Sequence, residues 1–336
     1  MLFVLIAVCV ISVPIALIQP RWDRGLAWFV GLVLVLLSGL RTGGFDYDEY
    51  LTMIESVRAA DEFAVRLLFA KDPFFLMIID VCGLVTEDVW LVFLVVAVLS
   101  VMTKVLATAI MPGRRTLFMA LYAVFLAPGY EFAAIRAGLA VGFMLLAVSR
   151  TGFWRWVWAL FGVASHSSAA AVAAGLGLRQ YPRLAVLGMV ATLPVALSLL
   201  IRFGQDDPRY SSYFGAGGTT FALILPAVTA AVLGALVPPL RQVWLRSHGA
   251  LRDAALGAAV CIAAALALAL PFVAVSFRLL EMSWPLILVQ LSILSVAPVR
   301  GVARVSLYGA WALMVIILST SNFLRSTWFE MPGMGT

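Results

Sequence analysis

The sequence predicts an all-α, polytopic integral membrane protein. Hydrophobic residues make up 63% of the 336-residue chain and charged residues only 12%, whereas soluble domains carry roughly 25% charged residues. The mean hydropathy is +1.05. Apolar runs such as residues 2–18 and 256–275 approach the ~20 residues that cross ~30 Å of hydrocarbon as a helix. Because several such runs follow one another, the chain should cross the membrane many times.

The apolar runs predict about twelve membrane segments within a single transmembrane domain over residues 1–336. No Lys or Arg precedes the first run and no small-residue cleavage site follows it, so it should be a retained helix. The 73–85 run is too short to span and should be re-entrant or interfacial. The 154–178 run is broken at "SHSS" and should form two short helices. The expected starts lie near residues 2, 26, 89, 116, 131, 154, 167, 184, 219, 253, 283 and 304.

The distribution of basic residues predicts the topology. Cytoplasmic loops are enriched in Lys and Arg, so Lys104 and the arginine groups between apolar runs should be cytoplasmic. Residues 41–88 and 202–218 should then be extracytoplasmic loops, and both termini should lie on that outer side. The arginine groups are Arg21/Arg24, Arg114/Arg115, Arg150/Arg155, Arg179/Arg183, Arg300/Arg304 and the triple Arg241, Arg246 and Arg252. These residues are scattered and form no basic patch, which argues against a nucleic-acid partner.

Several arginines remain that the topology does not explain. Arg136 lies one to two turns into an expected membrane helix, where an unpaired arginine costs a few kcal/mol. It either forms a structural ion pair with Glu131 or another carboxylate, or binds a ligand. Arg278 either binds a ligand or extends to the interface where the helix from 253 ends. Arg209 lies beside Asp206 and Asp207 and either pairs with them or has a functional role.

Candidates for general-base and metal chemistry also lie on the expected outer side. His166 falls where the hydrophobic run breaks, and an imidazole accepts a proton near neutral pH. A histidine hydrogen-bonded within a helix turn is the alternative. Asp46, Asp48 and Glu49 have oxygen ligands that suit a divalent cation, but no histidine is nearby in the sequence. We therefore expect a solvated acidic surface there and no metal site.

Six short stretches, taken together, resemble the EpsG-like branch of the Wzy-type bacterial polysaccharide polymerases. They are "LRTGGFDYDEY", "KDPFF", "IRAGLAVGF", "ASHSSAAAV", "RYSSYFGAG" and "FRLLEMSWP", and they occur in the family's order over roughly residues 38–285. Two positions depart from the pattern. Asp72 stands where a glutamate precedes the proline, and "IRAG" replaces an arginine followed by a polar residue.

The resemblance implies a GT-C-like, lipid-dependent glycosyltransferase architecture in the bacterial inner membrane, with an active site facing the periplasm. The implied reaction moves a growing glycan from undecaprenyl diphosphate onto the non-reducing end of a lipid-linked repeat unit. Both the donor and the acceptor would be lipid-linked oligosaccharides in the membrane, no metal or other cofactor is expected, and a chain-length regulator is a candidate protein partner.

The chemistry of that reaction suggests roles for the candidate residues. Arginine's planar fork suits diphosphate oxygens, and Arg136 and Arg278 are the first choices, with Arg41 and Arg209 beside them. The acceptor hydroxyl needs a base, for which His166, Asp46 and Glu131 are candidates and His166 is favoured. The tyrosines of the two outer loops should stack on sugars, although aromatic residues also line membrane interfaces. These are Tyr47, Tyr50, Tyr210 and Tyr213.

Three other readings remain open. An O-antigen-ligase-like enzyme would use the same donor with a different acceptor, but the short 202–218 loop favours polymerisation. A transporter or lipid flippase would need charges that line a path through both leaflets, whereas the unexplained charges gather on one face. An acyltransferase would fit a histidine in a helix break but would not explain the arginines.

Overall fold

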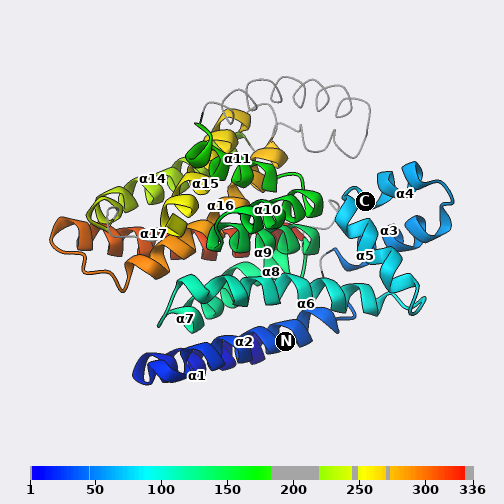
Figure 1. The fold of residues 1–336 in the computed structure, drawn as a ribbon, viewed down its shortest axis with the longest axis horizontal. Coiled ribbons are helices and arrows are strands. Elements are labelled where there is room, and N and C mark those ends of the chain that lie inside the picture. Colours follow the sequence, from blue (N-terminus) through cyan, green and yellow to red (C-terminus); the bar gives the residue numbers. More distant parts are fainter. Residues whose placement is uncertain (1, 45, 183–218, 244–248, 270–272, 330–336) are drawn as a thin grey trace. The chain divides into compact units, whose positions relative to one another are not determined.

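The computed structural model describes residues 2–44, 46–182, 219–243, 249–269 and 273–329. It is 85% helical, and the described residues form no strand, which confirms the all-α prediction (Figure 1). Six of the described helices are long and apolar enough to cross a membrane, and three shorter helices are also apolar. The chain is therefore a helical membrane protein, and about twelve spans remain a prediction.

The chain divides into two compact units, residues 1–167 with 318–336 (unit 1) and residues 168–317 (unit 2). The main helices of unit 1 are α1 (Leu2–Ile18), α2 (Asp23–Gly39), α6 (Trp90–Ala107), α9 (Ile135–Ser149) and α10 (Phe153–Ser165), of which α2 and α6 are long and apolar enough to cross a membrane. Shorter elements connect them: η1 (Pro20–Trp22), α3 (Tyr47–Ala59), α4 (Phe63–Ala70), α5 (Pro73–Gly83), η2 (Thr108–Ile110), α7 (Arg115–Leu121), the π-helical η3 (Tyr122–Leu126) and α8 (Ala127–Tyr130).

Glycines allow the central helices of unit 1 to pack closely. A Cβ at Gly39 would lie 2.9 Å from a side-chain carbon of Leu94, so α2 approaches α6 where glycine stands. A Cβ at Gly142 would lie 2.7 Å from the carbonyl oxygen of Ser100, so α9 approaches α6 in the same way. Gly138 and Gly142 are four residues apart on α9, the small-residue spacing that brings membrane helices together. Helices α2, α6 and α9 thus form the frame of unit 1.

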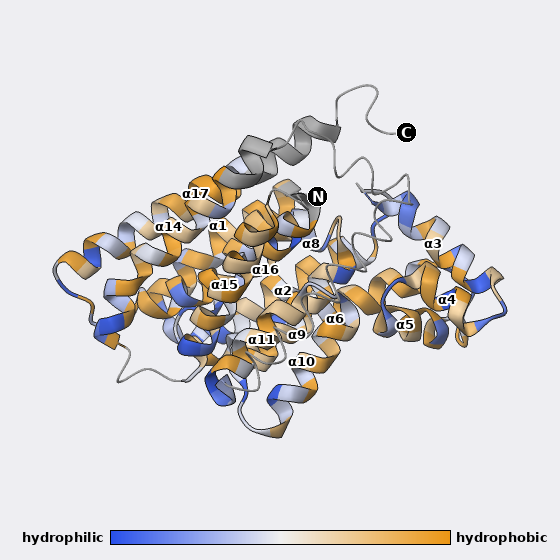
Figure 2. Ribbon diagram, turned by 90° about the horizontal axis from the view of Figure 1, so that it is seen from above, coloured by the Kyte–Doolittle hydropathy of each residue, from blue (hydrophilic) through white to orange (hydrophobic). Residues whose placement is uncertain are grey.

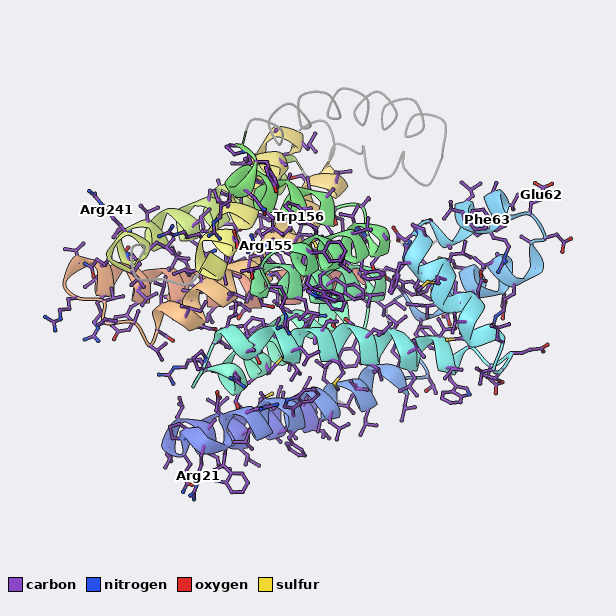
Figure 3. The ribbon with its side chains drawn as sticks, in the orientation of Figure 1. Arg21, Glu62, Phe63, Arg155, Trp156 and Arg241 are labelled. Atoms are coloured by element: carbon purple, nitrogen blue, oxygen red, sulfur yellow. The ribbon has the colours of Figure 1, made fainter. Side chains whose placement is uncertain are left out.

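One end of unit 1 is organised by Asp23. Its carboxylate accepts hydrogen bonds from the backbone N–H groups of Arg115 (3.1 Å) and Thr116 (3.0 Å), which satisfies donors that the start of α7 would otherwise leave unpaired. Figure 3 shows Arg21 at this end, with Glu62 and Phe63 at the opposite end of the same unit. The arginine groups at 21–24 and 114–115 therefore share one end of unit 1, as the charge pattern predicts.

The 41–88 segment folds as three helices, α3, α4 and α5. The predicted short run forms α5, which buries Phe75, Leu76 and Ile79 in a core shared with residues of α6 and α9. Figure 2 shows the hydrophilic residues of this region at the start of α3 and in the turn before α4, while α5 and α6 are largely hydrophobic. The polar start of α3 is thus anchored to the apolar frame by α5.

Unit 2 contains α11 (Ala169–Gln180), α14 (Thr219–Val243), α15 (Gly249–Leu268), α16 (Val273–Leu294) and most of α17 (Val302–Phe329). The break at "SHSS" is confirmed, because α10 ends at Ser165 and α11 begins at Ala169. The start near 283 is wrong: α16 already begins at Val273, and Arg278 lies in its second turn rather than at the end of the preceding helix. The segment near 184 and the 202–218 loop lie outside the described residues.

Candidate functional site

Arg41 is a buried cation whose donors are not all used. It follows the end of α2, is only 5% exposed, and donates from Nη1 to the backbone carbonyl of Glu131 at 3.2 Å. Its guanidinium lies 5.1 Å from the ring of Phe93 and 6.0 Å from that of Tyr47. Its Nε and Nη2 atoms are buried and have no hydrogen-bond partner among the described residues. Since buried donors are nearly always paired, these two invite an acceptor from a ligand.

The second arginine of unit 1 that meets these aromatic side chains is Arg136, in the first turn of α9. Its Nη1 contacts the Asp72 carboxylate at 2.6 Å and the carbonyl of Ala70 at 3.1 Å, and its guanidinium lies 5.8 Å from the ring of Tyr50. Its Nε is buried and also lacks a partner within the described chain. Asp72 therefore balances the charge of Arg136 but leaves one of its donor nitrogens without an acceptor in the described chain.

Aromatic side chains connect the two arginines. Tyr47 stacks on Phe93 with ring centroids 5.0 Å apart, and Tyr50 packs edge-on against Phe93 at 6.4 Å. The guanidinium of Arg41 faces Phe93 and Tyr47, and that of Arg136 faces Tyr50. We call Arg41, Tyr47, Tyr50, Asp72 and Arg136 the arginine cluster.

Backbone geometry places Gly44 directly against this cluster. Gly44 has φ +135°, a conformation that side-chain-bearing residues rarely adopt. A Cβ there would lie 2.9 Å from the carbonyl oxygen of Phe132 and 3.5 Å from Nη1 of Arg41. Only glycine fits this approach, so Gly44 packs directly between the Phe132 carbonyl and Arg41.

Asp72 has an unusual acidity for an aspartate. Burial raises the pKa of its carboxyl group to about 6, although Arg136 acts in the opposite direction. The residue is 7% exposed and lies directly before Pro73, the first residue of α5. The ion pair with Arg136 is therefore weakened by protonation in mildly acidic solution.

A second polar cluster lies deeper in unit 1. Lys104 of α6 and Glu131 are 0% and 2% exposed, and Nζ of the lysine lies 2.9 Å from Oε1 of the glutamate. The same oxygen accepts hydrogen bonds from Ser100 (3.0 Å) and from the hydroxyl of Tyr122 (2.8 Å). Lys104 also donates to the carbonyl of Gly138 at 2.6 Å. We call Ser100, Lys104, Tyr122 and Glu131 the lysine cluster. Lys104, expected near the cytoplasmic end of its helix, has its side chain buried against a carboxylate inside the helix bundle.

The other candidate bases lie at the edges of this region. His166 follows α10 in an extended conformation and is partly exposed. A Cβ at Gly162 would meet the side chain of Met144 and the carbonyl of Ala140, so the end of α10 that leads to His166 packs against the middle of α9, the helix that carries Arg136 in its first turn. Asp46 is partly exposed and precedes α3, and its charge acts on Arg41.

The remaining candidates do not join the arginine cluster within the described residues. Arg278 is in unit 2, where it pairs with Glu281 at 3.1 Å and stays 43% exposed. Arg209, Tyr210 and Tyr213 lie outside the described residues. Among the residues that the structure describes, no group of three or more His, Cys, Asp or Glu side chains could hold a metal ion.

Sequence reasoning did not select Asp72, Lys104 or Ser100 as site residues. The sequence does mark Asp72, because an acid before a proline is part of the "KDPFF" stretch that resembles the family. It also marks Ser100 and Lys104, since polar residues four apart in an apolar helix lie on the same face.

Comparison with curated proteins and with solved structures found no match. The model of the EpsG family matches residues 26–330, a range that contains both polar clusters and most of the 336-residue sequence. The chain therefore belongs to the EpsG family.

Proposed function

We propose that this protein is a polysaccharide polymerase that acts on undecaprenyl-diphosphate-linked glycans at the extracytoplasmic face of the bacterial inner membrane. The donor glycan is transferred onto the non-reducing end of a lipid-linked repeat unit. The observation that carries the proposal is Arg41, a buried cation with two unpaired N–H donors, beside a second arginine across an aromatic pair. Family membership supports the polymerase activity.

In the proposed reaction the acceptor hydroxyl attacks the anomeric carbon of the donor sugar and loses its proton to a base. The bond between that carbon and the diphosphate oxygen breaks, and undecaprenyl diphosphate leaves as an anion. Arg41 and Arg136 bind its phosphate oxygens and stabilise the charge that develops in the transition state. Because the leaving group departs ionised, the reaction needs no acid to protonate it, and we assign the stabilisation of its charge to the two arginines rather than to a metal.

We propose His166 rather than Glu131 as the base. The Glu131 carboxylate is buried and already accepts bonds from Lys104, Ser100 and Tyr122, so we propose a structural role for it. His166 is partly exposed and follows α10, which packs against the middle of the helix that carries Arg136. Asp46, next to the start of α3, is the second candidate.

The sugars of the donor and acceptor require a polar, aromatic surface beside the diphosphate. We propose that Tyr47 and Tyr50 contribute to it, together with Tyr210 and Tyr213 of the second loop. Arg209 and Arg278 stay candidate ligands for phosphate groups of the lipid-linked substrates.

The test is polymerisation by purified, reconstituted protein supplied with its native lipid-linked repeat unit, without nucleotide sugar or added metal. A ladder of multiples on a gel, lost in Arg136→Ala and Arg41→Ala, is the expected result. Arg21→Ala is the matched control, because Arg21 lies at the opposite end of unit 1 and bonds the exposed side chain of Gln19. Single units alone from a folded protein would exclude polymerisation and direct the assay to transfer onto a lipid A core.

A further inference from the structure

The lysine cluster is bonded to the segments that carry both arginines of the arginine cluster. Lys104 contacts the carboxylate of Glu131, and the backbone carbonyl of that same glutamate accepts the hydrogen bond from Arg41. Lys104 also donates to the carbonyl of Gly138, which lies two residues after Arg136 in α9. One ammonium group therefore holds the turn that Arg41 contacts and the first turns of the helix that carries Arg136.

Stability alone does not explain a lysine at this depth. A charged side chain inside a membrane helix is costly to insert, and buried ion pairs can often be replaced by apolar residues of similar size with no loss of stability. Leu, Met or Ala at position 104 would suit the otherwise apolar run of α6. A role in positioning therefore explains the pair better than free energy of folding does.

The packing around the lysine cluster leaves little freedom for movement. A Cβ at Gly138 would lie 2.9 Å from the carbonyl oxygen of Tyr130 and 3.2 Å from Oε1 of Glu131. The 130–131 turn thus rests directly on the backbone of α9. A displacement of the Glu131 carboxylate moves this turn, and the carbonyl that orients Arg41 moves with it.

We infer that Lys104 is a positioning residue that fixes the separation of Arg41 and Arg136 through Glu131 and the Gly138 carbonyl, so that both guanidinium groups meet one diphosphate. The inference rests on the proposed function. Its chemical reason is that a displacement of about 1 Å in a binding group can cost about 100-fold in rate. Lys104 itself does not touch the substrate.

A double-mutant cycle tests the inference, with undecaprenyl diphosphate as the probe and detergent-solubilised full-length protein. We expect Lys104→Met and Arg41→Gln each to weaken binding about 10-fold, in line with loss of a hydrogen bond to a charged group. The double variant should bind well under 100-fold more weakly than wild type, because the effect of Lys104 on Arg41 is lost once Arg41 is replaced and only its hold on the helix of Arg136 remains. An additive loss of about 100-fold would overturn the inference, since independent sites add.

A neutral pair, Lys104→Met with Glu131→Gln, separates positioning from stability. It leaves no unpaired buried charge, so its unfolding temperature should return toward the wild-type value. Its affinity for undecaprenyl diphosphate should stay about 10-fold weaker, since the bond to Gly138 is still absent. If affinity recovers together with stability, Lys104 has only a structural role and the inference is wrong.

A control variant and the wild-type protein itself separate the possible outcomes. Thr108→Val removes a buried hydroxyl one turn beyond Lys104 that bonds only within its own helix, to Val105, and should leave the affinity unchanged. If wild-type protein binds undecaprenyl diphosphate but the cycle is additive, the inference alone fails. If wild-type protein neither binds the probe nor polymerises the repeat unit, the proposed function fails first.

Discussion

The two polar clusters of unit 1 contain similar groups but use them differently. In the lysine cluster the ammonium of Lys104 has four polar contacts within 3.1 Å, and one oxygen of Glu131 is contacted by three donors. In the arginine cluster, Nε of Arg41 and of Arg136 and Nη2 of Arg41 have no partner in the described chain. A saturated network rigidifies a protein, whereas buried donors left open indicate a place for a ligand.

The sharpest way to test the contrast is to remove one carboxylate from each cluster. Glu131→Gln leaves Lys104 buried without a counter-charge and should destabilise the protein by about 3–5 kcal/mol. Asp72→Asn should cost much less, because burial already disfavours the charged Asp72 and an asparagine still accepts a bond from Arg136. Thermal unfolding in detergent measures both. Equal losses of stability in the two variants would mean that the carboxylates of the two clusters have the same structural role.

Removing the open cations should have the next largest effect, on activity rather than on stability. Arg41→Gln and Arg136→Gln should lower the initial rate of polymer formation about 10²–10³-fold, the cost of losing one donor to a developing anion. Arg21→Gln should retain the wild-type rate. If Arg41→Gln and Arg136→Gln both kept more than a tenth of the wild-type rate, the unpaired donors of these arginines would not bind the substrate.

A smaller perturbation should act on the contact between the clusters. Gly138→Ala forces a methyl group against the carbonyl of Tyr130, and overpacking of this kind costs about 1–3 kcal/mol. The affinity for undecaprenyl diphosphate should fall along with the unfolding temperature. Gly25→Ala is the matched helical control, because nothing lies within 4 Å of its added Cβ. If both variants behave alike, helix propensity and not the contact is responsible.

The smallest expected effect is a pH dependence that belongs to the arginine cluster. The pKa of Asp72 is raised from 3.8 to about 6, so the folded protein holds this proton more tightly than the unfolded chain. This group's contribution to stability is therefore full below about pH 4 and falls as the pH rises to about 6.

Ligand binding should change in the same direction. Below about pH 6 neutral Asp72 releases Arg136, and a diphosphate esterified at both ends should bind a few-fold more tightly at about pH 5 than at about pH 7. Asp72→Asn should bind with the same affinity at both values. A wild-type affinity that does not change with pH would show that Asp72 does not compete with the ligand.

The contrast also explains what the sequence could and could not reveal. Apolar runs of helical length predict helices directly, and the break at His166 is visible because polar residues interrupt such a run. Arg41 and Arg136 stand out because arginine is costly in an apolar segment. Their approach across Tyr50 and Phe93 depends on helix packing, which one sequence without structure does not specify.

Two differences between the charge pattern and the structure have physical causes in side-chain reach and pairing. Lys104 resembles a cation at the cytoplasmic end of a helix, but its four-carbon stem allows it to turn inward to Glu131. Arg278 and Glu281 look like a polar helix end, yet they pair three residues apart on one face, so α16 continues through them from Val273. In both cases the sequence shows the charged residue but does not show which carboxylate it pairs with.

The π-helical turn at Tyr122–Leu126 has a consequence for helical phase. Each residue of an α-helix advances the chain by about 100° around the axis. The turn begins at Tyr122, whose hydroxyl donates a hydrogen bond to the carboxylate of Glu131 nine residues further on. Deleting one residue here would rotate Glu131 away from Lys104, whereas exchanging one apolar side chain for another would not. The segment should therefore tolerate exchanges among the apolar residues that follow Tyr122, but not the insertion or deletion of a residue.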